Sequence, residues 1–178
     1  MKINAPLPNE WWQIFENRGP QTKPPGICNM YVADIMTKNP VIVHLDDTLR
    51  VALLKMEEIG CHHLPVVGID GHLVGIVSER DCRRAIHPPN ILRDRHQVDA
   101  LADNLPVRGI MTPAPIIIEP DAPAEEAARL MLGNHIGCLP VMRSETLIGI
   151  ITRSDILMAF MNLQRQRVNG DIPDTPKH

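Results

Sequence analysis

The sequence predicts a mixed α/β fold (α/β or α+β) built from two copies of one strand-helix-strand-strand-helix unit. Ile35-Met36-Thr37 opens a series of strand and helix patterns that Ile110-Met111-Thr112 opens again, with 75 positions between the two methionines. Leu64-Pro65-Val66 and Leu139-Pro140-Val141 match at the same spacing. Apolar anchors that stay in register are typical of a duplicated folding unit. We therefore expect pseudo-twofold symmetry, with the copies packed through their sheets and with clefts between them.

The first copy begins with Val41-Ile42-Val43, a β-branched run that predicts a strand. Asp46 and Asp47 are candidate N-caps of the helix that follows, because a short carboxylate accepts hydrogen bonds from the free N–H groups of a helix start. Apolar residues spaced three and four apart predict one buried face on this helix. They are Leu49, Ala52, Leu53, Met56 and Ile59.

The rest of the first copy predicts a hairpin and a second helix. Residues 64–67 and 73–77 are apolar runs separated by Asp70-Gly71, so we expect two strands joined by a turn. Ser78 is the expected N-cap of a helix over residues 79–86, which two prolines then end.

The second copy repeats this order with smaller side chains. Ile116-Ile117-Ile118 predicts the strand and Asp121 the N-cap of the helix. Its apolar face carries three alanines and one methionine, which predicts closer packing of this helix than of its counterpart. They are Ala124, Ala127, Ala128 and Met131.

Composition shifts divide the chain into five predicted segments. The first holds five prolines together with Trp11-Trp12, and packing on the body, a dimer contact and a docking segment for a partner all remain open for it. The segment between the copies mixes charged with spaced apolar residues, which fits a linker helix. The segments are an extension (1–31), the first repeat (32–86), the linker (87–106), the second repeat (107–160) and a polar, frayed tail (161–178).

Charge and cysteine content narrow the class of protein. A formal net charge of -3 gives no reason to expect nucleic-acid binding. No apolar run reaches the length of a membrane span, and the N-terminus lacks the pattern of a signal peptide. The cysteines show no paired spacing, so we expect reduced thiols in a cytoplasmic protein and no metal site. They are Cys28, Cys61, Cys82 and Cys138.

The most informative motif closes each copy. A Gly-apolar-apolar strand delivers Ser78 and then Asp81 in the first copy, and Thr152 and then Asp155 in the second. A helix N-terminus favours an anion, the hydroxyl can donate to a phosphate or ribose oxygen, and the carboxylate can accept from sugar hydroxyls. A capping box has the same pattern and serves helix stability alone. A single copy would favour the cap, but two copies in register favour a binding site.

These motifs resemble a tandem pair of cystathionine-β-synthase (CBS) domains, called a Bateman module, over residues 32–160. The Ile-Met-Thr start, the Leu-Pro-Val strand and the Gly-apolar-apolar-Ser/Thr-x-x-Asp ending carry the resemblance, since all three occur in both copies. The resemblance implies two β-α-β-β-α units, clefts that accept adenosine derivatives, and a homodimer.

The resemblance also implies roles for particular residues. Asp81 and Asp155 match the acidic position that holds the ribose hydroxyls, and Ser78 and Thr152 match the hydroxyl position near ribose and phosphate. Arginines lie where some family members contact phosphate, and the segment after each Ile-Met matches the lining of the adenine pocket. The remaining residues of this set are Arg80, Arg153, Thr37, Pro40, Val41, Thr112 and Ile116.

The copies differ just before the Leu-Pro strand. His62-His63 resembles a basic pair that contacts phosphate in the AMP-activated protein kinase gamma subunit, whereas the second copy has Gly137-Cys138. Two open clefts should therefore differ in affinity or in preferred phosphate number. If either histidine contacts phosphate, binding should tighten at lower pH. Alternatively, both are merely polar residues at a strand start.

The sequence indicates no enzyme. Neighbouring motifs assemble no Ser-His-Asp, Cys-His or paired-carboxylate set, and neither a P-loop nor a Gly-x-Gly-x-x-Gly is present. We expect a regulatory module with no covalent cofactor that binds AMP, ADP or ATP and signals to an effector protein by conformational change. The alternatives are a constitutive dimerisation scaffold with empty clefts and a sensor of S-adenosylmethionine or a dinucleotide. Ligand identity, occupancy of the two clefts and dimer orientation stay open.

Overall fold

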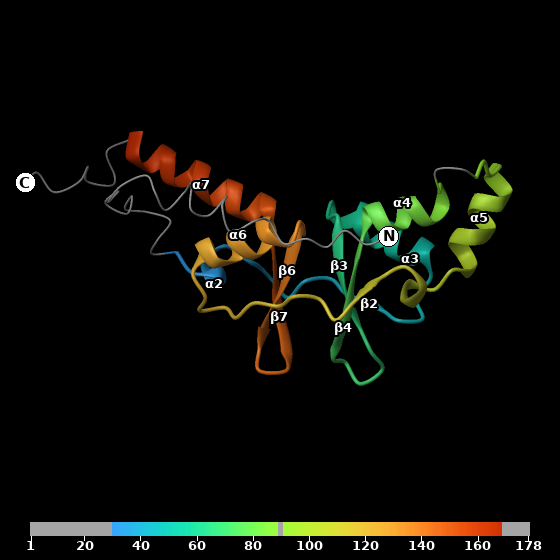
Figure 1. The fold of residues 1–178 in the computed structure, drawn as a ribbon, viewed down its shortest axis with the longest axis horizontal. Coiled ribbons are helices and arrows are strands. Elements are labelled where there is room, and N and C mark those ends of the chain that lie inside the picture. Colours follow the sequence, from blue (N-terminus) through green and yellow to red (C-terminus); the bar gives the residue numbers. More distant parts are fainter. Residues whose placement is uncertain (1–29, 89–90, 169–178) are drawn as a thin grey trace, which may run out of the picture. The chain divides into compact units, whose positions relative to one another are not determined.

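A computed structural model describes residues 30–88 and 91–168 (Figure 1). Residues 1–29 of the predicted extension, which include Trp11-Trp12 and Cys28, lie outside the described residues. The described chain divides into two compact units. The larger unit comprises residues 37–117 and 140–150 and the smaller one the other described residues, so that the strands of the last hairpin belong partly to each.

The larger unit contains a four-stranded sheet in the order β2-β3-β4-β5. Strand β2 is parallel to β3, whereas the β3-β4 and β4-β5 pairs are antiparallel. The β3-β4 hairpin is the predicted one, and its turn includes Gly71 at φ = 80°, a conformation that glycine adopts without steric cost. The strands are β2 (Val43–His44), β3 (His63–Val67), β4 (Leu73–Ser78) and β5 (Thr112–Pro113).

Three helices pack with this sheet around one core (Figure 1). Helices α3 and α4 are the two predicted for the first copy, and α5 is the predicted linker helix. Leu49, Ala52 and Met56 are buried as the helical spacing predicts, whereas Ile59 at the end of α3 is half exposed. The helices are α3 (Leu49–Ile59), α4 (Glu79–Ile86) and α5 (Arg95–Asn104), and a short 3₁₀ helix, η2 (Val107–Gly109), leads into β5.

The predicted N-caps of α3 are wrong. Thr48 is the cap, and its hydroxyl accepts from the Val51 N–H at 3.4 Å. The Asp47 carboxylate instead accepts from the His44 N–H at 2.9 Å and lies 3.4 Å from the Lys55 ammonium. Because Asp47 stabilises the turn before the helix, the next hydroxyl along the chain is left to cap the helix itself.

The smaller unit contains α2 (Val32–Ile35), α6 (Ala124–Gly133) and α7 (Arg153–Val168). Ala124, Ala127 and Met131 are buried on the predicted face of α6. The predicted cap Asp121 is wrong, because Pro123 occupies the N-cap position and makes no side-chain hydrogen bond. The Ala124 N–H donates to the Met30 carbonyl at 2.8 Å, so backbone from the start of the described chain replaces a capping side chain.

The first strand of each copy, which we call its leading strand, pairs with a strand of the other copy. The leading strands are β1 and β5. A three-stranded sheet has the order β1-β7-β6, and its edge strand β1 (Thr37–Lys38) comes from the first copy although β6 (Cys138–Arg143) and β7 (Thr146–Thr152) belong to the second. Conversely, β5 begins the second copy but pairs with β4 of the first. The sequence indicated the repeat but not this exchange.

Three further predictions differ from the structure. Only Val43 of the run 41–43 lies in a strand, and Ile116 and Ile117 lie in none. Both isoleucines are exposed, so their β propensity is not matched by a partner strand. Helix α7 continues to Val168, through part of the tail predicted to be frayed. The mixed α/β fold, with strands and helices from both copies, is confirmed.

Candidate ligand site

The Ser78 and Asp81 side chains meet where β4 becomes helix α4. The Ser78 hydroxyl lies 2.5 Å from Asp81 Oδ2, and the Ser78 N–H donates to the same oxygen at 3.1 Å. The Asp81 N–H in turn donates to the Ser78 hydroxyl oxygen at 3.2 Å. The pair is therefore a complete capping box, and both side chains are half-buried.

Thr152 and Asp155 repeat this geometry where β7 becomes α7. Asp155 Oδ2 accepts from the Thr152 N–H at 2.7 Å and from its hydroxyl at 2.8 Å. The Asp155 N–H donates to the Thr152 hydroxyl oxygen at 3.3 Å. Within the described residues, both boxes use Oδ2 and leave Oδ1 of each carboxylate without a hydrogen bond. One acceptor oxygen per copy thus remains for a ligand hydroxyl.

The two histidines lie beside the first of these boxes. His63 is directly opposite Ser78 in the β3-β4 ladder, and the His62 carbonyl accepts from the Glu79 N–H at 3.0 Å. His62 Nδ1 is 2.7 Å from the Glu79 carboxylate, which also pairs with Arg83. The structure therefore brings both predicted histidines to the N-terminus of α4, with His62 held by an acidic neighbour.

Glu79 is the residue that the sequence analysis did not single out. Its pKa is lowered, first by hydrogen bonding to Arg83 and then by His62. The i,i+4 spacing of Glu79 and Arg83 could have predicted their ion pair. The contact between Glu79 and His62 could not be predicted from sequence spacing, because it depends on the β3-β4 register.

The two predicted arginines do not occupy equivalent positions. Arg153 directly follows Thr152 and donates from Nε to the Ile136 carbonyl at 3.0 Å. Its counterpart in the first copy is Glu79, whereas Arg80 is one position later and lines a separate hollow on α4. The first helix turn thus holds two acids and an arginine in the first copy, and one arginine and one acid in the second.

The leading strands bring the remaining predicted residues next to the motif strands, that is, to β4 and β7, which end in Ser78 and Thr152. Thr112 is opposite Ile76, two residues before Ser78, and Thr37 is opposite Ile150, two residues before Thr152. Thr37 and Thr112 are exposed, as are Val41 and Ile116 farther along each segment, while Pro40 is half-buried.

Each leading strand is followed by a strained residue that precedes a proline. Asn39 has φ = 49° and Ala114 has φ = 46°, left-handed values that cost free energy in residues other than glycine. The proline that follows each of these residues favours an extended backbone at the residue before it, which adds to the strain. Such strain clusters at ligand-binding segments. Its occurrence at equivalent positions of both copies marks these turns as candidate ligand contacts.

Two thiols have raised pKa values, and the described ranges hold no cluster of metal ligands. Burial, and then the neighbouring Asp81 charge, raise the pKa of the Cys82 thiol to about 11. Burial also raises the pKa of Cys61. Among residues 30–88 and 91–168, no three His, Cys, Asp or Glu side chains gather as metal ligands. No helix of this part is long and apolar enough to span a bilayer.

The fold and the doubled motif define a tandem-repeat α/β module. The sequence pattern described as "CBS domain" matches residues 32–88 and 107–162. A CBS domain-containing protein of Dictyostelium discoideum is 39% identical over 127 residues, which cover 71% of this chain and 88% of that protein. The chain therefore belongs to the CBS domain family, as a tandem pair.

Two solved structures are similar in fold. CBSX2 in complex with AMP has a TM-score of 0.61 and 30% identity, with 76% of this chain and 98% of that chain covered. The CBS domain pair of protein MJ0100, in complex with 5'-methylthioadenosine and S-adenosylmethionine, has a TM-score of 0.63 and 26% identity, with coverage of 75% and 97%. By contrast, this chain covers only 22% of an inosine-5'-monophosphate dehydrogenase of Methanocaldococcus jannaschii.

Proposed function

We propose that this CBS pair is a non-catalytic regulatory module that binds an adenine nucleotide (AMP, ADP or ATP) and signals to a partner protein by conformational change. One observation carries the proposal. The same hydroxyl-carboxylate arrangement occurs at both strand-to-helix junctions, and in each copy the motif strand pairs with the other copy's leading strand. A ligand held between a motif strand and a leading strand would bias how the copies are arranged.

The chemistry of the first copy suits a nucleoside. Asp81 Oδ1 is the oxygen left to accept from ribose hydroxyls, and Thr112 is exposed two residues along the paired strand. The N-terminus of α4 favours a phosphate, and His63 lies opposite its cap. Because Glu79 already engages His62, the charge available to a phosphate is smaller than the histidine pair suggested.

The relatives support an adenosine-type ligand without fixing its phosphate number. CBSX2 binds AMP, and MJ0100 binds 5'-methylthioadenosine and S-adenosylmethionine. Glu79 in one copy and Arg153 in the other differ in charge at the same point of the motif. We therefore propose that the two sites differ in affinity for phosphorylated ligands.

We also propose that the chain forms a homodimer in the cytoplasm. Leu54 on α3 is 57% exposed, and Leu157 and Met158 on α7 are 63% and 60% exposed. We propose that these exposed apolar side chains contribute to the surface that a second copy covers. The free thiols of Cys61 and Cys82 fit a reducing compartment.

A constitutive assembly scaffold is the second candidate. Both capping boxes are complete without any ligand, so Ser78, Asp81 and their counterparts already have a structural role. Under this alternative the same residues stabilise two helices, and the leading-strand turns contact no ligand.

Calorimetry with matched variants separates the two candidates. Purified protein is titrated with AMP, ADP, ATP, S-adenosylmethionine and NAD, and the titrations are repeated on Asp81→Asn and Asp155→Asn. The side-chain oxygen of asparagine still accepts the capping hydrogen bonds. The substitution removes the negative charge that favours ribose hydroxyls as donors. Thr48→Ala is the control, because it removes a helix cap away from the motif.

Each outcome decides between the candidates. Micromolar binding that weakens in one or both Asp→Asn variants, but not in Thr48→Ala, supports the sensor and ranks the two copies. Absence of heat with every ligand, together with an unchanged melting temperature, rejects the sensor and favours the scaffold. Binding of S-adenosylmethionine or NAD alone would change the ligand class.

A further inference from the structure

A pocket lies among helices α3, α4 and α5, apart from the capping motif. Its volume is about 480 Å³, which is within the range of small-molecule sites. Leu53, Met56, Ile86 and Val98 supply its apolar surface, one or two from each helix. Neither Ser78, Asp81 nor Thr112 lines it. His62 and Glu79 do line it, so the pocket adjoins the proposed nucleotide site but does not contain its capping pair. We call it the α3-α4-α5 pocket.

A second hollow continues from this pocket along α4. Its volume is about 330 Å³, and Arg80, Arg83, Arg84 and His87 line it. Arg83 and His87 also line the α3-α4-α5 pocket, so the two hollows share a boundary. An open, partly apolar pocket thus lies beside a group of basic side chains.

The basic side chains on α4 are incompletely neutralised. Arg83 pairs with Glu79, but Arg80 and Arg84 form no ion pair or hydrogen bond with any residue in the described ranges. Arg80 and Arg84 are four positions apart on one helix, a spacing at which like charges destabilise the helix. Arg80 is in the first turn, where the helix dipole opposes a cation. An anion bound here would remove both costs.

The acidic side chains nearby do not fill this role. Glu79 is occupied by His62 and Arg83, and Glu57 lines the pocket but not the basic hollow. The Arg93 guanidinium donates to the Ala85 and Ile86 carbonyls at the end of α4, which adds a further positive charge to the region.

We propose that the α3-α4-α5 pocket binds a small amphipathic anion, with an apolar tail among Leu53, Met56 and Val98 and a carboxylate or phosphate head at Arg80 and Arg84. The occupant is a free small molecule, because the apolar surface is concave and a bilayer would require an apolar face that projects. This site adjoins the proposed nucleotide site, because Arg80 is also one of the residues predicted to contact phosphate, whereas Arg84 is not.

The first test is calorimetry of the full chain with decanoate as the probe. Decanol has the same tail without the charge, and decyltrimethylammonium has the opposite charge. Saturable binding of about one decanoate per chain, with weaker binding of decanol and weakest binding of the cation, is the expected order. Equal binding of all three probes, or no binding of decanoate, overturns the proposal.

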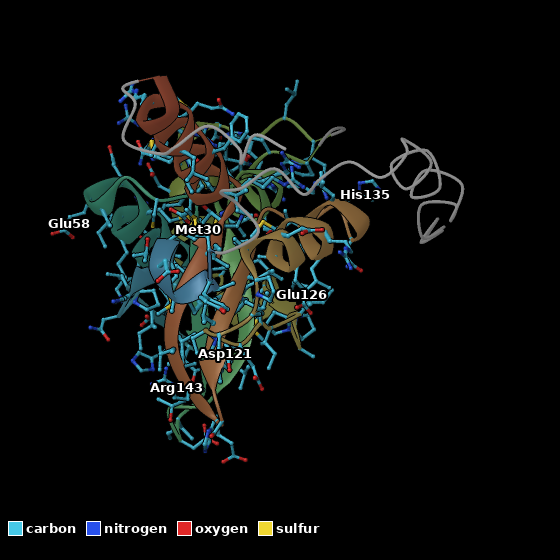
Figure 2. All side chains as sticks on the ribbon, turned by 90° about the vertical axis from the view of Figure 1, so that its left-hand side faces the viewer. Met30, Glu58, Asp121, Glu126, His135 and Arg143 are labelled. Atoms are coloured by element: carbon cyan, nitrogen blue, oxygen red, sulfur yellow. The ribbon has the colours of Figure 1, made fainter. Side chains whose placement is uncertain are left out.

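Two variants locate the probe. Arg84→Glu should weaken decanoate binding by about fivefold or more, as expected for an exposed ion pair that becomes a repulsion. Arg143→Glu, at the exposed end of β6, makes the same change in net charge and should leave decanoate binding unaltered (Figure 2). Val98→Asp should weaken decanoate binding by placing a carboxylate in the apolar part, with circular dichroism to verify that α5 is retained.

Three further outcomes are decisive. AMP titration of Arg84→Glu separates the two sites. Loss of decanoate binding supports the pocket if the AMP titration of the variant matches that of the parent, even if neither binds AMP. Equal decanoate affinity in Arg84→Glu and the parent rejects the assignment of the head group. Co-sedimentation with phosphatidylglycerol vesicles in the absence of decanoate binding rejects a free ligand and indicates a membrane surface instead.

Discussion

Gly60 and His135 lie at equivalent positions after helices α3 and α6, and both have left-handed φ values, 70° at Gly60 and 55° at His135. Gly60 follows α3 as its C-cap, and its N–H donates to the Glu57 carbonyl at 3.3 Å. His135 comes after α6 and is exposed (Figure 2). The duplicated backbone has thus kept a conformation that suits glycine, while one copy holds a side chain that does not.

Replacement of His135 with glycine should stabilise the protein by about 1 kcal/mol. A left-handed conformation costs a residue with a Cβ about 1–2 kcal/mol, and the greater freedom of glycine in the unfolded state takes back part of the gain. Urea unfolding measures the change. Gly60→Ala is the reciprocal variant and should destabilise by a similar amount, and a loss of stability in His135→Gly would contradict the strain argument.

Ser78→Ala should lower the free energy of unfolding by about 1 kcal/mol, the usual effect of a lost N-cap. The Ser78 oxygen accepts from the Asp81 N–H, and alanine leaves that donor without its partner. Thr48→Ala should lower stability similarly through α3. Comparison of the two by chemical denaturation, followed by AMP titration, tests the motif further, because only Ser78→Ala should also weaken AMP binding.

Gly75→Ala should destabilise the protein by about 1–3 kcal/mol through overpacking. A Cβ at Gly75 would lie 2.6 Å from the Met111 sulfur and 3.0 Å from the Thr112 carbonyl oxygen. The methionine can move, but the carbonyl belongs to strand β5. Amide exchange of β5 should accelerate in this variant. Gly133→Ala is the control, because no described atom lies within 4 Å of the position that the alanine methyl would occupy and φ is not in the left-handed region.

Arg50→Met should loosen helix α5 while it changes global stability by less than about 1 kcal/mol, since the ion pairs are half exposed. Arg50 Nη2 lies 2.9 Å from Asp99 Oδ1, and its Nε pairs with Asp103. The guanidinium also lowers the pKa of Asp103. Hydrogen exchange should increase in residues 95–104 in low salt, and added salt should reduce the difference between variant and parent. Unchanged exchange would show that apolar contacts alone hold α5.

Glu79 should contribute to stability at neutral pH and lose that contribution in acid. Its folded pKa lies below the unfolded value of about 4.3 because of Arg83 and His62, so the stabilisation is present above that unfolded value and disappears as pH falls through the folded pKa. Glu79→Gln should therefore flatten the dependence of unfolding free energy on pH below about 5. Glu58→Gln is the control at an exposed position of α3 (Figure 2).

The repeat, the hairpin and helix α4 were predictable because local pattern alone determines them. The bounds of α4 match the prediction, since Ser78 caps one end and basic residues occupy the last turn. The exposed run Ile116-Ile117 was misread because β propensity reports only a potential strand, whereas a strand forms where a partner is present. The cap of α3 was misassigned because the Asp47 carboxylate accepts from the His44 N–H, before the helix, and not from an N–H of the helix itself.

The sequence predicted which residues meet at each strand-to-helix junction. It did not predict which residues from other elements lie beside them. Ser78 and Asp81 are three positions apart, so their hydrogen bonds follow from the helix start itself. The proximity of Thr112 to the first copy's motif strand required knowledge of an exchanged strand pairing, which no short-range pattern contains. The Glu79-His62 contact likewise joins residues 17 positions apart through strand register.

The exchanged leading strands make each copy dependent on chain that belongs to the other. Strand β4 obtains its second neighbour from β5, and β7 obtains its second neighbour from β1. A gene fragment that encodes one copy would therefore yield a sheet with an uncovered edge, which is prone to pair with another molecule. The two copies therefore depend on each other for their sheet pairing, while residues at equivalent positions can still differ in charge, as Glu79 and Arg153 do.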